Sequence, residues 1–126
     1  MLAYTTIGVS DMEAARKFYG ELFAELGATE MFQRPDGGVV AYGVDPTRPM
    51  FGIAKPYNGE AASPGNGAMI AVAAKDPAQV KSLYDKAIAL GATCDGPAGP
   101  RLDGAVSCGY VRDADGNKLN FFCMGS

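Results

Sequence analysis

The chain has 126 residues and a mass of 13.1 kDa, with 48% hydrophobic and 20% charged residues, which is typical of one globular domain and not of a disordered chain. Eleven basic against fourteen acidic residues give a net charge of −3, which argues against a nucleic-acid or anionic-membrane partner, since both select clustered positive charge. Histidine is absent, and this excludes histidine-based metal sites and triad hydrolases.

The first half of the chain predicts a strand, a helix and three further strands. Residues 5–9 are short, apolar and rich in β-formers, as expected of a buried strand. Ser10 and Glu13 have the spacing of a capping box, so we expect Ser10 to begin a helix. Gly27 lies where a helix ends in a left-handed residue. The strands predicted after it are residues 30–34, 39–44 and 50–54.

The second half follows the same order after a linker at residues 57–66. A strand at residues 69–73 precedes a helix in which Asp76 is the expected cap and Pro77 the first helical residue. Residues 95–104 are rich in Pro and Gly, and we expect a loop long enough to be a functional flap. The last two predicted strands, joined by a five-residue turn, are residues 107–112 and 118–124.

The two halves resemble one another. Asp11 and Tyr19 recur as Asp76 and Tyr84, 65 residues later, and the sequence Leu-Gly-Ala-Thr at residues 26–29 recurs at residues 90–93. We therefore predict a single domain, residues 1–126, made of two copies of a βαβββ unit. The predicted modules are residues 1–56 and 67–126.

Three segments resemble the vicinal oxygen chelate superfamily, which includes glyoxalase I, the bleomycin and fosfomycin resistance proteins and the extradiol dioxygenases. They are residues 5–19, residues 65–72, and the ending at residues 110–119 with its Arg-Asp-Ala-Asp-Gly-Asn turn. The resemblance implies an α+β fold in which two βαβββ modules form a curled mixed sheet around a small-molecule cup, with the helices outside. It also implies a homodimer, with modules paired within one chain or exchanged between two.

Metal-dependent members of that family hold a divalent ion on the floor of the cup. The resemblance places their ligand positions on Tyr4, Met69 and Asn120 of this chain. Neutral tyrosine, methionine and asparagine side chains do not supply the imidazole or carboxylate donors that such ions need. We therefore expect no metal and no other cofactor.

Alternation along the strands predicts which side chains face the cup. The five-residue turn pairs Tyr110 with Asn120 and Cys108 with Phe122, so these pairs share one face. Arg101 is expected to reach in from the flap. The predicted ligand-binding residues are Tyr4, Thr6, Met69, Arg101, Cys108, Tyr110, Asn120 and Phe122.

Three functions are compatible with such a cup. The first is a binding protein that sequesters or carries a hydrophobic or aromatic small molecule, and this is the reading we favour. The second is a glyoxalase-, lyase- or dioxygenase-like enzyme working without the usual metal, with Tyr4, Tyr110 or Arg101 as proton donor or oxyanion stabiliser. The third is a structural or regulatory dimer with a vestigial cup. The sequence names neither the ligand nor the role of residues 95–104.

The cysteines and the hydropathy pattern bear on location. Three cysteines at irregular spacing resemble reduced thiols more than a disulfide framework. No apolar run approaches the roughly 18–20 residues of a membrane span, and the N-terminus has no signal-peptide pattern. We therefore expect a cytoplasmic protein without a membrane partner.

Overall fold

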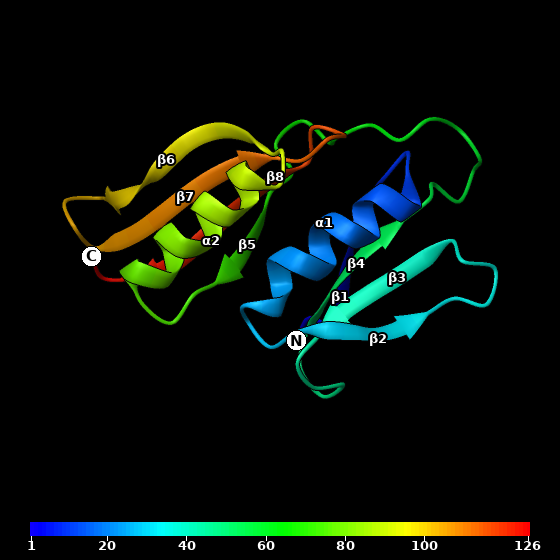
Figure 1. Cartoon of the computed structure of the whole chain (residues 1–126), viewed down its shortest axis with the longest axis horizontal. Coiled ribbons are helices and arrows are strands. Elements are labelled where there is room, and N and C mark those ends of the chain that lie inside the picture. Colours follow the sequence, from blue (N-terminus) through cyan, green and yellow to red (C-terminus); the bar gives the residue numbers. More distant parts are fainter. The chain divides into compact units, whose positions relative to one another are not determined.

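Two units of similar length make up the protein in the computed structural model, which describes residues 1–126. The first is Met1–Pro64 and the second Gly65–Ser126. Each consists of one helix and one four-stranded mixed sheet, an α+β arrangement, and Figure 1 shows each helix lying across one face of its own sheet. No helix combines the length and the apolar character that crossing a membrane requires.

The two sheets have the same topology. In each, the first and fourth strands of the unit pair in parallel and the other neighbours are antiparallel, so the predicted duplication is confirmed. The sheet orders are β1-β4-β3-β2 and β5-β8-β7-β6. The elements are β1 (Tyr4–Gly8), α1 (Met12–Ala24), β2 (Thr29–Gln33), β3 (Val39–Gly43), β4 (Met50–Ala54), β5 (Ile70–Ala73), α2 (Pro77–Ala89), β6 (Thr93–Arg101), β7 (Val106–Arg112) and β8 (Lys118–Met124).

The helix starts agree with the prediction in one unit and differ by one residue in the other. Asp76 caps α2, accepting a hydrogen bond from Gln79 N at 2.8 Å, and Pro77 follows as predicted. The prediction that Ser10 caps α1 is wrong, because Asp11 occupies that position and accepts from Ala14 N at 3.0 Å. A carboxylate satisfies the free amide and also favours the positive end of the helix dipole.

In the first unit, α1 covers the face of the sheet that carries Phe51. The ring of Phe51 lies 5.0 Å from those of both Tyr19 and Phe23, which are almost fully buried. Its register partner on β1 is Thr5. Because successive strand residues point to opposite faces, Tyr4 and Thr6 lie on the face that α1 leaves uncovered.

In the second unit, α2 packs closely onto β7 and β8. A Cβ added to Gly109 would lie 3.2 Å from Tyr84 Cβ, closer than most side-chain contacts, so a glycine here favours the close approach. Phe121, the register partner of Gly109, and Leu119 are fully buried on the same face. Residues 108, 110, 120 and 122 therefore lie on the opposite face.

The expected flap at residues 95–104 is a wrong prediction. Strand β6 runs through Pro97 and Pro100 and pairs with β7, with irregularities around Gly96. Proline lacks an N–H group, but β6 is an edge strand, where one side of the backbone needs no partner. Only the short turn at residues 102–105 joins β6 to β7. Strand β5 also begins at Ile70, so Met69 lies just before it and not within it.

Candidate functional site

The uncovered face of the second sheet is the face opposite α2. Register confirms the predicted strand pairing, in which Tyr110 lies opposite Asn120 and Cys108 opposite Phe122. Ala71 on β5 is the partner of Asn120 on its other side. The uncovered face is thus defined by Ala71, Cys108, Tyr110, Asn120 and Phe122.

Asn120 is the unusual residue of this face. Its side chain is only 4% exposed, and its Oδ1 atom is buried without any hydrogen-bond partner. Leaving a buried polar group unpaired costs about 1–3 kcal/mol, so such atoms are rare in native proteins and call for an explanation. Tyr110 beside it is half-buried.

Arg101 lies over the ring of Tyr110. Its Cζ atom is 5.8 Å from the ring centroid, within the range of a cation–π contact. Its guanidinium donates to the backbone oxygens of Pro97 at 2.6 Å and Pro100 at 3.1 Å. Gly96 makes room for the ring, since a Cβ there would lie 2.9 Å from Tyr110 Cδ2. The edge strand therefore holds both Arg101 and Tyr110 in place.

Lys118 contacts the same ring from β8, and sequence reasoning missed it. Its Nζ atom is 5.1 Å from the Tyr110 centroid and 3.4 Å from Asp95 Oδ2. Arg112 Nε lies 2.9 Å from the same oxygen. The hydrogen bond from Arg112, and then that from Lys118, hold the pKa of Asp95 below its ordinary value. Strand alternation already places residue 118 on the face of residue 120, so the signal was available.

The hydroxyl of Tyr110 stays protonated at neutral pH. A hydrogen bond with the Cys108 thiol, and then burial, raise the pKa of Tyr110 above its ordinary value near 10. A phenol in that state donates hydrogen bonds but is a poor general base at neutral pH.

The remaining predicted site residues lie elsewhere in the fold. Tyr4 is 58% exposed on the uncovered face of the first sheet, and Thr6 shares that face. Met69, 44% exposed, precedes β5. The structure brings Arg101, Cys108, Tyr110, Asn120 and Phe122 together on one sheet.

These residues do not fit the divalent ion of metal-dependent relatives. No three His, Cys, Asp or Glu side chains come close enough together to hold a metal ion. At the positions that the resemblance assigns to ligands, Tyr4, Met69 and Asn120 offer a phenol, a thioether and an amide. Such a donor set does not match zinc, nickel, manganese or iron.

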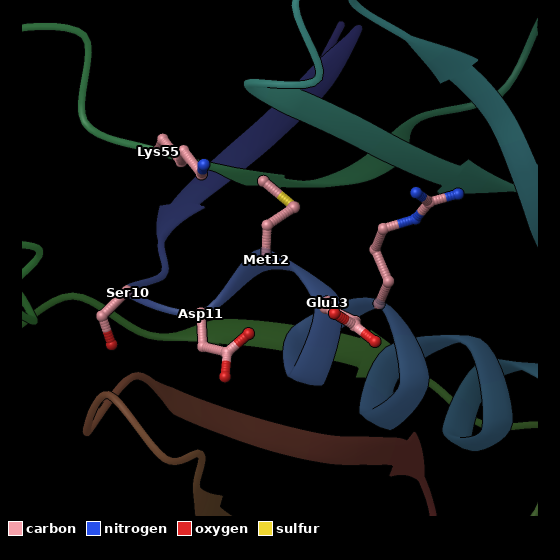
Figure 2. A pocket seen from close by; sticks show the side chains of 6 residues that line it. Ser10, Asp11, Met12, Glu13 and Lys55 are labelled. Carbon is pink, nitrogen blue, oxygen red and sulfur yellow. The ribbon is translucent and has the colours of Figure 1, made fainter.

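A separate hollow of about 800 Å³ lies at the start of α1. Figure 2 shows Met12 reaching toward Lys55, while Ser10 and Asp11 point to the other side. Two of its polar side chains already have partners: Asp11 caps the helix, and Arg16 forms two bonds with Glu30 at 2.8 and 2.9 Å. The hollow is therefore a weaker candidate than the uncovered face of the second sheet.

Comparison with known proteins identifies the fold. A model of the Glyoxalase/Bleomycin resistance protein/Dioxygenase superfamily matches residues 1–121. A glyoxalase/bleomycin resistance protein from Albidiferax ferrireducens T118 is 35% identical over 97% of both chains, with a TM-score of 0.85.

Two further structures share the fold. A glyoxalase-related enzyme from Fulvimarina pelagi has 24% identity, a TM-score of 0.74, and coverage of 100% of this chain and 95% of that one. Lactoylglutathione lyase from Agrobacterium tumefaciens has 19% identity, a TM-score of 0.69, and coverage of 97% and 92%. No curated protein matches the sequence.

Proposed function

The chain belongs to the glyoxalase/bleomycin resistance protein/dioxygenase superfamily, and we propose that it is a metal-independent protein that sequesters or carries a hydrophobic or aromatic small molecule. The observation that carries this proposal is the buried Asn120 Oδ1 without a partner, on a face shared with Tyr110 and Phe122. A mostly apolar surface with a few convergent polar groups is the usual composition of a small-molecule site. A donor on a ligand would satisfy the Asn120 oxygen.

We assign the ligand contacts first to the second sheet. The proposed contacts on this sheet are Arg101, Cys108, Tyr110, Asn120 and Phe122. Met69, the residue just before β5, is also included. Tyr4 and Thr6 are proposed as further ligand contacts on the first sheet. Exposed apolar side chains on the uncovered face of the first sheet, Tyr4 and Phe32, support this assignment because such surfaces usually mark binding sites.

Binding is favoured over catalysis by the state of the ionisable groups. The phenol of Tyr110 is protonated, and Asp95 is tied to Arg112 and Lys118. Tyr110 can therefore donate a proton but not accept one near neutral pH, and neither Asp95 nor a histidine supplies the base that would complete the reaction. A vestigial structural role is disfavoured because a face without a ligand gains nothing from an unpaired buried amide.

The proposal includes a homodimer in the cytoplasm. It also includes a single domain in which modules 1–56 and 67–126 are joined by the linker 57–66. Membership of the superfamily supports the homodimer, because its members often dimerise. Unpaired Cys94, Cys108 and Cys123 support a reducing compartment.

Native mass spectrometry of gently purified protein tests the proposal. We expect a dimer that carries a small organic adduct, and loss of that adduct in Tyr110→Phe combined with Asn120→Ala. The matched control is Asn58→Ala, an exposed loop asparagine, which should keep the adduct. One metal ion per chain would return the protein to the metal-dependent enzymes. A bare protein that also binds no aromatic fragment would favour the structural role.

A further inference from the structure

Arg101 differs from the other arginines that pack against the sheets. Arg16, Arg34 and Arg112 each form an ion pair with a carboxylate at 2.7–2.9 Å. Arg101 has no carboxylate within 4.0 Å, and its partners are two backbone oxygens and the ring of Tyr110.

The charge around Tyr110 is positive although the whole chain is acidic. Arg101, Arg112 and Lys118 face a single carboxylate, that of Asp95, so these four side chains carry a net charge of +2. Asp95 is shared between Arg112 and Lys118, which leaves the charge of Arg101 uncompensated. A planar guanidinium with free donors is well suited to a carboxylate.

The unpaired acceptor, Asn120 on β8, is separated from Arg101 on β6 by strand β7, which carries Tyr110. Asn120 is the register partner of Tyr110, whose ring Arg101 covers. Arg101 therefore lacks an anionic partner, and Asn120, on the other side of Tyr110, lacks a hydrogen-bond donor. Both deficits are met by one molecule that carries an anionic group and a hydroxyl or N–H group.

Resting on the proposed function, we propose that the ligand of this face is a small aromatic acid with a hydrogen-bond donor, whose carboxylate pairs with Arg101 and whose donor binds Asn120 Oδ1. Tyr110 and Phe122 supply the apolar surface between the two polar contacts. Arg101 then determines specificity for anions over neutral molecules of the same shape.

Three matched compounds test this inference in the full-length protein: meta-hydroxybenzoate, its neutral analogue meta-hydroxybenzamide, and benzoate, which lacks the hydroxyl. Binding is measured by titration with heteronuclear NMR, following the amide signals of Tyr110 and Asn120. We expect meta-hydroxybenzoate to bind about tenfold more tightly than the amide, the amount that one charge-assisted pair contributes. Added salt should weaken the acid and leave the amide unchanged.

Variants separate the two contacts. Arg101→Gln should abolish the preference for the acid, and Arg101→Lys should retain part of it. Asn120→Leu should abolish the advantage of meta-hydroxybenzoate over benzoate. The control Arg48→Gln, at an exposed loop position of the first unit, should change neither ratio.

The outcomes that overturn the inference are distinct from failure of the proposed function. If meta-hydroxybenzoate and meta-hydroxybenzamide bind equally well, Arg101 does not select anions, but the protein still binds small molecules. An acid preference that persists in Arg101→Gln shows that the anion binds elsewhere. If no compound shifts the signals of Tyr110 and Asn120 at millimolar concentration, the ligand class is wrong, and the co-purified adduct alone decides the proposed function.

Discussion

Two asparagines of the second unit are equally buried and opposite in their bonding. Asn117 is 6% exposed; its backbone N–H and its Nδ2 bond the two carboxylate oxygens of Asp113, at 2.9 and 3.0 Å. Asn120 is 4% exposed and its Oδ1 has no partner. The first is explained by the turn that it stabilises, whereas no group of the chain satisfies the second.

The pair gives a prediction about stability. Asn120→Leu should raise the free energy of unfolding by about 1 kcal/mol, because it replaces an unpaired buried amide with an apolar group of similar size. The same change should weaken ligand binding by removing the hydrogen bond to Asn120, so stability is gained at the expense of function. Urea denaturation measures the first effect. As the control, Asn117→Leu should lower the free energy of unfolding by about 1–3 kcal/mol, because it removes the hydrogen bond from Asn117 Nδ2 to Asp113. A destabilised Asn120→Leu would show that the amide supports the fold.

At this scale the sequence predicts positions better than roles. Alternation and the length of the turn were enough to place Tyr110, Asn120, Cys108 and Phe122 on one face. That Asn120 lacks a partner depends on the exact position of every neighbouring donor, which no pattern of residue types encodes. The contact of Lys118 with Tyr110 depends likewise on side-chain conformation.

Among the elements, β6 departs most from expectation. Its two prolines and two glycines indicate a loop, and yet it is a nine-residue edge strand. The pairing that holds it comes from β7, which lies later in the chain. Local propensity cannot report a partner that is supplied by tertiary structure.

Gly96 tests how β6 shapes the site. Its φ of 145° lies in a region that disfavours side chains, and a Cβ would lie 2.9 Å from the ring of Tyr110. Gly96→Ala should therefore destabilise the protein by about 1–3 kcal/mol and weaken ligand binding by displacing Tyr110. Gly99→Ala is the matched control, because the nearest atom to its Cβ would be Arg101 Nη1 at an ordinary 3.6 Å. Chemical denaturation and the binding assay check both, and equal effects at the two positions would contradict this role for Gly96.

The start of α1 gives a prediction that separates two neighbouring residues. Asp11 accepts the bond from Ala14 N, although the spacing of Ser10 and Glu13 favoured Ser10. Asp11→Ala should cost about 1 kcal/mol of unfolding free energy, and Asp11→Asn should recover most of it, because an amide oxygen also caps helices. Thermal unfolding of the two variants is sufficient to test this. If Asp11→Ala is silent, the cap does not stabilise the helix.

For the whole molecule, the duplication is the feature that the sequence predicts most fully. Residues that recur 64 or 65 positions apart predict two equivalent units, and the two sheets have equivalent strand orders. The uncovered faces nevertheless differ: the first carries Tyr4, Thr6 and Phe32, and the second adds Arg101 and Lys118 around Tyr110. Repetition therefore fixes the architecture, while the chemistry of each copy depends on residues that do not repeat.

Carboxylates in both units determine the response to acid. Hydrogen bonds from Arg16, Arg34 and Arg112 lower the pKa values of Glu30, Asp36 and Asp95 respectively. A carboxyl group with a lowered pKa in the folded state stabilises the protein above its unfolded pKa, and this contribution is lost as the pH falls through the folded value. We expect stability to fall below about pH 4.

Glu30→Gln checks the contribution of one such group. Its side chain is 35% exposed, so the loss near neutral pH should be at most about 1 kcal/mol. The difference from the wild type should shrink as the pH falls through the acid limb. Glu60→Gln, at an exposed position, is the control and should match the wild type throughout. Urea denaturation at several pH values measures both, and a Glu30→Gln difference that does not change with pH would show that packing, not charge, is responsible.

Tyr42 contributes to the loss of stability at alkaline pH, as do Tyr84 and Tyr110, whose pKa values are raised by hydrogen bonds with the thiols of Cys94 and Cys108. Burial first, and then the charge of Glu30, raise the pKa of Tyr42 to about 12, while its hydroxyl donates to Arg16 O at 3.2 Å. The folded state therefore keeps this proton after the unfolded chain has lost it near pH 10. Its stabilising contribution is complete below that pH and is lost as the pH rises through about 12. Tyr42→Phe should cost about 1 kcal/mol at neutral pH, through the lost hydrogen bond, and should flatten the fall in stability above about pH 10. The control Tyr57→Phe, at a side chain that is 94% exposed, should retain the wild-type profile.

Because the chain has no histidine, the free energy of unfolding should be nearly constant between the acidic and alkaline transitions. A steep change in the unfolding free energy between about pH 5 and 8 would require a titrating group that these residues do not provide.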